Sequence, residues 1–316
     1  LAAVNGAYKR DKSGRISVSE VFKVDSDVDY RTGNIRCSAS AEIEGDVKAG
    51  FEVHVEGDLE VKGLVENADI EVKGDLAVRY GFTQGAAPVT VGGELRAMYI
   101  YNRSLIKAGS LQIKEMIGFS DLIVDGDVTA NRIVGGKIIA KGDIVCEEIG
   151  SAQHESKTYI IAGLDFAKKK ERDKVKEEFE EEREALQKLR KENVDLAKWA
   201  AEFKKNAGKV MEEITQIASS EIAAKVQQNL KQKIARIREI TFEIENLENF
   251  IKENEVKIEE LNKALQNPKA KVIVNGTVFA GVHITIGENA VYQLKNPRRK
   301  VQFRLNNEGE IIVENL

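Results

Sequence analysis

The stretch VEGDLEVKGLVENADIEVKGDLAV, residues 55–78, carries the phrase Gly-Asp-Leu twice, beginning at Gly57 and at Gly74. Around this stretch an apolar residue recurs every six positions, and a second small or apolar residue stands two positions after each of the first five. The six-residue series is Ile35, Ala41, Val47, Val53, Leu59 and Val65. Two inward side chains separated by one outward residue match the period of a β-strand, so each repeat is predicted to be a short strand followed by a turn.

A longer period continues where the six-residue pattern loosens. Glycines followed by a polar residue and then an apolar one recur at intervals of 16 to 19 residues, at Gly57, Gly74, Gly93, Gly109, Gly126 and Gly142. About three six-residue repeats fill each interval, which predicts a parallel β-helix of about eight or nine coils with three short strands in each coil. Glycine reaches φ > 0 at a corner without steric cost, and the neighbouring Asp can hydrogen-bond a turn amide. We therefore interpret the Gly-Asp phrase as turn chemistry.

The β-helix is predicted over residues 31–164, with residues 1–30 as an N-terminal cap region. After Leu164 the sequence becomes dense in Lys and Glu, and apolar residues fall at alternating steps of three and four in two ladders of different phase. These a/d heptads predict a long antiparallel coiled-coil hairpin over residues 165–268 with its tip within 206–221. Asn193 and Asn254 occupy seam positions, where a polar residue fixes the register at some cost in stability.

Strand patterns return over residues 269–316. A helix must end at Pro268, and the sequence KVIVNGTVFAGVHITIG (271–287) again places a glycine, a short polar residue and a β-branched residue together. KVQFRLNNEGEIIVENL (300–316) predicts two strands around Asn307-Glu-Gly309, which would form a C-terminal strand cap. The fold class is therefore predicted to be mainly β, a parallel β-helix interrupted by a helical insertion.

The composition narrows the class of protein. The 316 residues include 48 basic and 52 acidic side chains, so the chain as a whole does not attract nucleic acid or anionic lipid. Two cysteines are too few for a disulfide framework, and no apolar run approaches the length of a membrane span. We expect a cytoplasmic protein that binds neither nucleic acid nor a cofactor and does not insert directly into membranes.

Repeated Gly-Asp raises the question of calcium. Repeat-type calcium sites use the denser phrase Gly-Gly-x-Gly-x-Asp, in which carboxylates from successive turns converge. This sequence supplies one such aspartate per coil, at Asp46, Asp58, Asp75, Asp127 and Asp143. Turn chemistry is the favoured interpretation, and no metal site is predicted.

Two enzyme classes that use β-helices are alternatives for this sequence. The six-residue period resembles that of hexapeptide acyltransferases, but it fails after residue 65 and no catalytic His stands on a recognisable loop. A polysaccharide-cleaving site would need clustered acids and an Arg, which Asp125, Asp127 and Arg132 could supply from one stretch. That stretch has no aromatic platform for a sugar, so these residues are interpreted as a solvated face and no catalytic residue is predicted.

The remaining reactive side chains are isolated in the sequence. His54, His154 and His283 lack metal-ligand spacing, and His54 is expected to point outward between Val53 and Val55. Cys37 and Cys146 fall on inward positions and are interpreted as small core residues. Ser151 near His154 matches no triad pattern, and the basic stretch NPRRK (296–300) is interpreted as a solvated turn.

Four stretches together resemble the β-helical region of the flagellar assembly protein A family: DVDYRTGNI (27–35), GDV (45–47), GDLEVKGLVENADIEVKGDLAV (57–78) and IVGGKIIAKGDIVCEEIGS (133–151). The helical interruption and the returning VFAGVHITIG (278–287) match the order of that family, and the similarity covers about residues 20–305. The sequence departs from the family at Ala280, where Pro would be expected. Many members carry a separate N-terminal domain that this sequence does not contain. The resemblance favours a right-handed coil, carries over no catalytic residue, and implies a bacterial protein of flagellar assembly or cell-envelope organisation.

The sequence thus predicts a non-enzymatic scaffolding or localisation protein that acts through protein–protein contacts. Its partners are expected to be other proteins, and copies of the chain could also associate through the coiled coil or the β-helix ends. The alternatives left open are a β-helix enzyme acting on an acidic polysaccharide and a self-assembling scaffold of the bactofilin kind.

Overall fold

In the computed structural model of the chain, the structure describes residues 7–10, 16–19, 21–103, 105–153, 157–217, 220–265 and 268–316. These residues belong to two compact units, Leu1–Ala167 with Leu265–Leu316, and Lys168–Ala264. The first unit is a β-solenoid of about 8 turns followed by further strands, and the second consists of two helices packed together. The predicted β-helix with a long helical insertion is confirmed.

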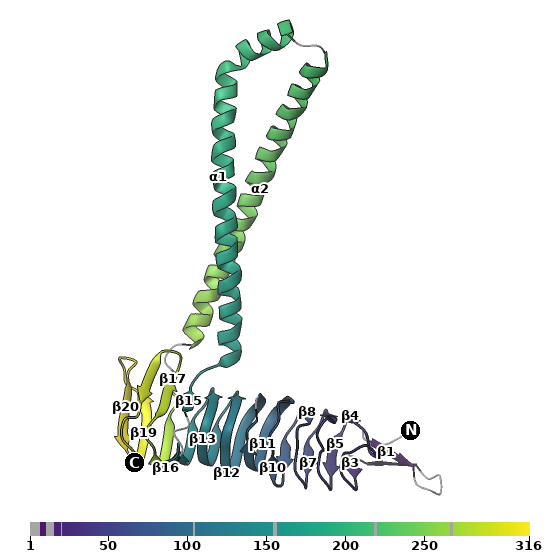
Figure 1. The fold of residues 1–316 in the computed structure, drawn as a ribbon, viewed down its shortest axis with the longest axis vertical. Helices are drawn as coiled ribbons and strands as arrows, with labels where there is room; N and C mark the ends of the chain where they lie inside the picture. The colour runs from purple at the N-terminus through teal and green to yellow at the C-terminus, as the bar shows by residue number, and fades with distance from the viewer. Residues whose placement is uncertain are drawn as a thin grey trace. The chain divides into compact units, whose positions relative to one another are not determined.

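Short strands form the first coils of the solenoid, and they stack in parallel on the equivalent strands of the next coil (Figure 1). One face pairs β3 with β5, β5 with β7, and β7 with β9, while a second face pairs β4 with β6 and β6 with β8. Their bounds are β3 (Val21–Val24), β4 (Ile35–Cys37), β5 (Ser40–Ile43), β6 (Glu52–Val55), β7 (Leu59–Val61), β8 (Asp69–Val72), β9 (Leu76–Val78) and β10 (Gly81–Phe82).

Longer strands form the later coils, because there the backbone stays paired through the corners. β11 pairs in parallel with β12, β12 with β13, and β13 with both β14 and β15; β16 and β17 continue these last two faces after the helical insertion. Their bounds are β11 (Val89–Tyr101), β12 (Ile106–Val124), β13 (Val128–Ala140), β14 (Ile144–Ile149), β15 (Thr158–Ala162), β16 (Val272–Val278) and β17 (Val282–Ile286).

The core is a column of inward side chains that runs the length of the solenoid. Val53 on β6 stands in register between Ile35 and Ile70, and Leu59 on β7 stands between Ala41 and Leu76. All six members of the six-residue series in the sequence are buried, with exposed fractions of 6% or less. Burying each large aliphatic side chain contributes roughly 1.5–3 kcal/mol, so the repeated inward pair is the main source of stability.

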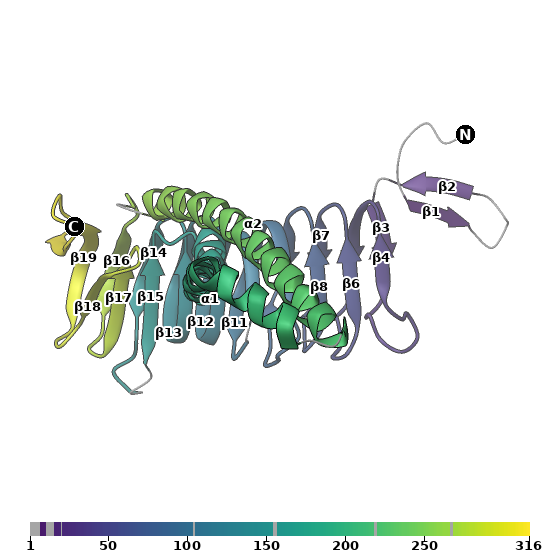
Figure 2. The same cartoon turned by 90° about the horizontal axis from the view of Figure 1, so that it is seen from above.

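The two ends of the solenoid differ. At the N-terminal end, β1 (Ala7–Arg10) and β2 (Ile16–Ser19) form a separate antiparallel pair, and the parallel stacking already begins with β3 at Val21 (Figure 2). Residues 1–6, 11–15 and 20 of the expected cap region lie outside the described residues. At the C-terminal end, β18 (Ala290–Gln293) pairs antiparallel with β17, and β19 (Arg298–Leu305) pairs antiparallel with both β16 and β20 (Ile311–Asn315). These strands cover the open edge of the last coil.

The helical unit contains α1 (Phe166–Ile217) and α2 (Ser220–Leu265); residues 218 and 219, within the expected tip, lie outside the described residues. Ion pairs show that the helices run antiparallel, because Arg190 contacts Glu248 at 2.8 Å while Glu192, further along α1, contacts Arg236 at 2.9 Å. No helix in the described residues combines the length and apolarity needed to cross a membrane.

Candidate functional site

The repeated Gly-Asp phrase binds the neighbouring coil. Asp58 Oδ1 accepts a hydrogen bond from the backbone amide of Asp75 at 2.8 Å, and Asp75 Oδ1 accepts one from the amide of Glu94 at 2.9 Å. A Cβ on Gly74 would lie only 2.1 Å from Asp58 Oδ1, so the glycine makes room for the carboxylate of the coil before it. The aspartate therefore holds an amide of the next coil rather than one of its own turn.

The same hydrogen bond between an aspartate and an amide of the next coil recurs along the solenoid. Asp46 Oδ1 accepts from the Leu64 amide and Asp127 Oδ1 from the Asp143 amide, at 2.8 and 2.7 Å. Asp143 Oδ1 in turn accepts from the amide of Lys271 at 2.8 Å, 128 residues later in the chain. This last bond joins the coil before the helical insertion to the coil after it. In the described part of the chain, no three His, Cys, Asp or Glu side chains gather as a metal site would require.

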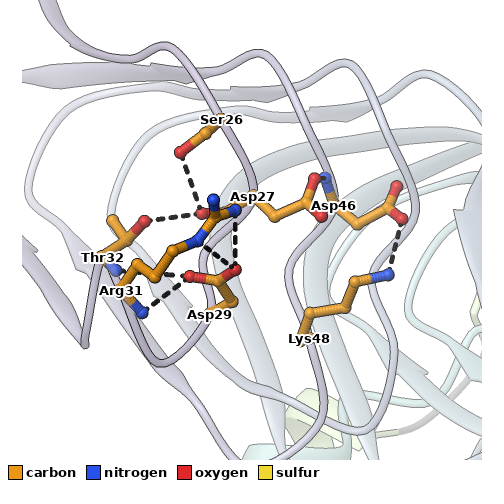
Figure 3. Close-up of polar contacts among 7 residues, drawn as sticks. All are labelled: Ser26, Asp27, Asp29, Arg31, Thr32, Asp46 and Lys48. Carbon is orange, nitrogen blue, oxygen red and sulfur yellow. Dashed lines mark hydrogen bonds and ion pairs between the residues drawn. The ribbon is translucent and has the colours of Figure 1, made fainter.

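Figure 3 shows the first of these corners. The Asp46 amide donates to Asp27 Oδ1 at 2.8 Å, and the Thr32 hydroxyl donates to the Asp27 carbonyl oxygen at 2.6 Å. The backbone amide and the guanidinium of Arg31 hold the pKa of Asp29 below its ordinary value. Lys48 Nζ lies 2.8 Å from the Asp46 carboxylate. The acidic side chains at this corner thus contact protein donors.

Replacing Asp58 separates the contribution of its hydrogen bond with the Asp75 amide from the contribution of its carboxylate charge. Asp58→Ala is expected to lower the free energy of unfolding by about 1 kcal/mol, because the Asp75 amide loses its acceptor. Asp58→Asn keeps an Oδ1 acceptor, so its free energy of unfolding should fall clearly less. Urea unfolding followed by circular dichroism measures both; equal losses would show that charge, not the hydrogen bond, is what matters.

Two of the three candidate polysaccharide residues, Asp127 and Arg132, contact neighbouring coils. The Asp127 carboxylate holds the Asp143 amide at a corner, and Arg132 on β13 donates from Nε to Glu148 Oε2 on β14 at 2.8 Å. The register of the two strands places Arg132 opposite Glu148. Arg132 thus pairs with a carboxylate of the next coil instead of with Asp125 or Asp127.

The isolated reactive residues have structural surroundings. His54 is half-buried between the buried Val53 and Val55, so it points outward as predicted. Burial raises the pKa of the Cys146 thiol, and its Sγ lies 3.8 Å from the Ile273 carbonyl oxygen. Cys37 is partly buried against the core, and the ring of His283 stacks on that of Tyr159 with a centroid distance of 4.9 Å. The Ser151 hydroxyl accepts a hydrogen bond from the Gln153 amide. The stretch 296–300 is exposed, and His154 lies outside the described residues.

Glu42 on β5 stands between two lysines of neighbouring coils. Lys23 Nζ lies 2.7 Å from Glu42 Oε2, and Lys62 contacts Oε1. Hydrogen bonds from Lys23 and then Lys62 lower the pKa of Glu42 from 4.5 to about 2. This stabilising contact is complete above pH 4.5 and is lost as the pH falls toward 2.

Glu42→Gln is therefore expected to weaken the solenoid at neutral pH, and this effect should shrink as the pH falls from 4.5 toward 2, where the wild-type carboxyl in the folded protein becomes protonated as well. The measurement is the urea midpoint of both proteins over this pH range. Glu71→Gln is a matched control, because Glu71 contacts one lysine, Lys73, where Glu42 contacts two. A wild-type-to-variant difference that stays constant down to pH 2 would contradict the expectation.

Sequence reasoning missed three polar residues with unusual surroundings. Arg103 is 1% exposed and donates from Nη2 to the Ala87 carbonyl oxygen at 2.9 Å, while burial lowers its pKa. In the helical unit, Glu182 occupies a seam position that the apolar pattern passed over; burial, then the neighbouring acids, raise its pKa. Lys233, another seam position, lies 4.0 Å above the ring of Trp199. The three-and-four spacing could have identified Glu182 and Lys233, but no pattern marks Arg103.

The predicted seam asparagines are both at least partly buried. Asn254 is 8% exposed, and Asn193 is half-buried. Asn254 Nδ2 and Glu182 Oε2 are each buried and have no hydrogen-bond partner among the described residues. The helix pair thus holds polar groups between its apolar positions, including Val175, Leu186 and Ile240, which are buried.

Comparison with known proteins agrees with this architecture. The family model described as the Flagellar Assembly Protein A beta solenoid domain matches residues 20–311. No curated protein and no solved structure matches the chain. The match spans the solenoid, the helical insertion and the returning strands, which is far more than half of the sequence. The chain belongs to the flagellar assembly protein A family.

Proposed function

We infer that this chain is a non-enzymatic cytoplasmic scaffold that holds or localises other proteins during flagellar assembly. The observation that carries the proposal is the use of the repeated carboxylates. Four of these carboxylates bind backbone amides of neighbouring coils, namely those of Asp58, Asp75, Asp127 and Asp143. The polar feature that recurs most often in the chain therefore joins the coils into a rigid solenoid. Family membership supports the link to flagellar assembly.

The helical unit supports a role in protein contacts. A helix rises 1.5 Å per residue, so the 52 residues of α1 and the 46 of α2 extend for roughly 70 Å. Large apolar side chains stay exposed on these helices, among them Val194, Phe242 and Val256, which are 52%, 65% and 58% exposed. Exposed apolar residues on a long, paired scaffold suit the binding of other proteins.

Removing the helical unit tests this proposal. Residues 168–264 would be replaced in the chromosome by a short Gly-Ser linker, since Ala167 and Leu265 both belong to the solenoid unit. We expect fewer or misplaced flagella by electron microscopy, as in a strain lacking the whole gene. Asp58→Asn, which keeps the coil-to-coil acceptor, serves as the control and should flagellate normally.

Two outcomes would contradict the proposal in different ways. Normal flagella without the gene would remove the flagellar role, whereas normal flagella without residues 168–264 would remove only the helical unit from it. Self-association through the helices or the solenoid ends belongs to the same proposal. Sedimentation of the full chain and of the shortened chain separates these two routes, because only the solenoid ends remain in the latter.

A further inference from the structure

A groove of about 420 Å³ on the side of the solenoid is lined by an excess of basic side chains. It crosses the coils that contain β7, β9, β11 and β12, and is here named the Arg79 groove. Its charged lining residues are Glu60, Lys62, Arg79, Arg96 and Lys114. Four basic groups and one carboxylate give this lining a net charge of +3, although the whole chain carries −4.

Two of the four basic groups are compensated by neighbouring carboxylates and two are not. Lys62 and Arg96 each contact carboxylates of the solenoid. Arg79 and Lys114 are exposed, and neither has an ion-pair partner among the described residues. Arg79 directly follows β9, which pairs with β11, and β11 pairs with the β12 strand that carries Lys114. The two uncompensated cations thus lie two coil steps apart, or roughly 10 Å.

The densest acidic stretch of the chain lies on α1, where residues 177–184 read EEFEEERE. Glu177, Glu181 and Glu184 follow the spacing of four and three residues that places side chains on one stripe of a helix. All three are exposed, and in the described part of the chain none of them forms an ion pair. This stripe, named here the Glu177 row, extends for seven residues, or roughly 10 Å. Like charges at this spacing repel one another, so cations that cover the row stabilise the helix.

We propose that the Glu177 row of a second copy of this chain docks in the Arg79 groove. The described ion pairs within one chain leave both surfaces uncompensated, so each can accept opposite charge from another molecule. The three carboxylates of the row equal the net charge of the groove lining. The lengths agree as well, because the outer glutamates of the row and the two uncompensated cations are both separated by roughly 10 Å. A helix lying along the solenoid axis therefore brings Glu177 and Glu184 against Arg79 and Lys114.

Nucleic acid fits the Arg79 groove less well than an acidic helix. Binding to a phosphate backbone depends on a track of many cations, whereas this groove offers two uncompensated ones and includes the Glu60 carboxylate. Ion pairs between exposed side chains are individually weak and are screened by salt. The contact between copies is therefore expected to be reversible and to weaken steeply as the ionic strength rises.

This contact uses the side of the solenoid rather than its ends, and it does not depend on a role in flagellar assembly. The test is sedimentation velocity of the purified full chain in about 50 mM and about 500 mM NaCl. A groove variant carries Arg79→Glu with Lys114→Glu, and a row variant carries Glu177→Lys with Glu184→Lys. Each variant is run alone, and the two are then run as an equimolar mixture.

Lys107→Glu with Lys137→Glu is the matched control for the groove variant. Both lysines are exposed on the solenoid and lie outside the lining of the Arg79 groove. The control changes the net charge by the same amount as the groove variant. It should associate as the wild type does.

The wild type is expected to associate at the lower salt concentration and to dissociate at the higher one. The association constant should fall at least about tenfold in the groove variant alone and in the row variant alone, because like charges then meet. The mixture should associate again, since the reversed groove of one variant meets the reversed row of the other. The native row and native groove also meet in the mixture, and this recovery requires a contact between copies.

Four results would overturn the proposal. They are a wild type that stays monomeric at the lower salt concentration, unchanged association in the groove variant, a mixture that does not recover, and an equal loss in the control. The last would show that net charge alone governs the association. Titration with a single-stranded oligothymidylate provides the nucleic-acid arm, and binding that is lost in the groove variant while self-association persists would replace the second copy with nucleic acid.

Discussion

Gly136→Ala is expected to destabilise the solenoid by about 3 kcal/mol, from two separate causes. The backbone at Gly136 has a φ of +77°, which residues with a Cβ adopt only with strain. The added Cβ would also lie 2.2 Å from the carbonyl oxygen of Ser120 and 2.5 Å from its nitrogen. Ser120 pairs with Gly136 between β12 and β13, so these backbone atoms cannot move without disturbing the ladder.

Gly50→Ala separates the two causes. Gly50 has a φ of +84°, but among the described residues no atom other than those of Gly50 and its two chain neighbours lies within 4 Å of the position its Cβ would take. The strain alone should therefore cost about 1 kcal/mol. Repeat proteins need not unfold in one step, so hydrogen exchange of peptides from β12 and β13 is the appropriate measurement for Gly136→Ala. If Gly136→Ala and Gly50→Ala lose the same stability, the backbone around Ser120 moves away from the added Cβ at no cost, which would contradict the expectation.

The solenoid could be predicted because its determinants repeat. The inward pair on β6, Val53 and Val55, is followed six residues later by Leu59 and Val61 on β7, and all four are buried. Each coil buries equivalent positions, so the pattern appears several times in one sequence. The helical insertion was predictable for the same reason, since the heptad spacing persists along both helices.

The partner of each corner aspartate could not be predicted from the sequence. Coil lengths vary from 16 to 19 residues, so the sequence does not say which amide of the next coil lies opposite a given side chain. The sequence offers Asp127 as an acid near Arg132, but the register places the Asp127 carboxylate against the Asp143 amide and Arg132 against the Glu148 carboxylate. Contacts between coils depend on this register, and a slip of one residue reverses every side chain.

Features that occur once were missed altogether. Phe119 follows Gly118 in a strand pattern that looks ordinary, and its left-handed backbone becomes evident only when it is aligned with the corner glycines of other coils. Arg103 shares this property, because its surroundings come from residues up to 37 positions earlier in the chain. A periodic pattern predicts the positions that all coils share, but it cannot predict a residue that occurs in a single coil.

Arg103→Met is expected to cost about 3 kcal/mol, because a buried guanidinium that serves several carbonyls is replaced by an apolar chain. Arg103 Nη2 donates to the carbonyl oxygens of Ala87 and Ala68 at 2.9 and 3.4 Å, and Nη1 donates to that of Glu66 at 3.4 Å. The guanidinium carbon also lies 6.0 Å from the ring centroid of Phe82. One side chain thus joins backbone segments from several coils at a single buried corner.

Arg96→Met is the matched control, because Arg96 is an arginine of the same solenoid whose side chain is 48% exposed and pairs with Glu94. A surface pair of this kind contributes little, so its loss should stay below about 1 kcal/mol. Hydrogen exchange at residues 66–68 and 85–87 would locate the loss in Arg103→Met, whereas Trp199 fluorescence should not change because Trp199 lies on α1. A buried charge can be replaced by apolar groups without loss when its partners find other donors. If hydrogen exchange at these residues is as slow in Arg103→Met as in the wild type, backbone amides alone satisfy these carbonyl groups. The positive charge at this corner would then be dispensable for the stacking of the coils.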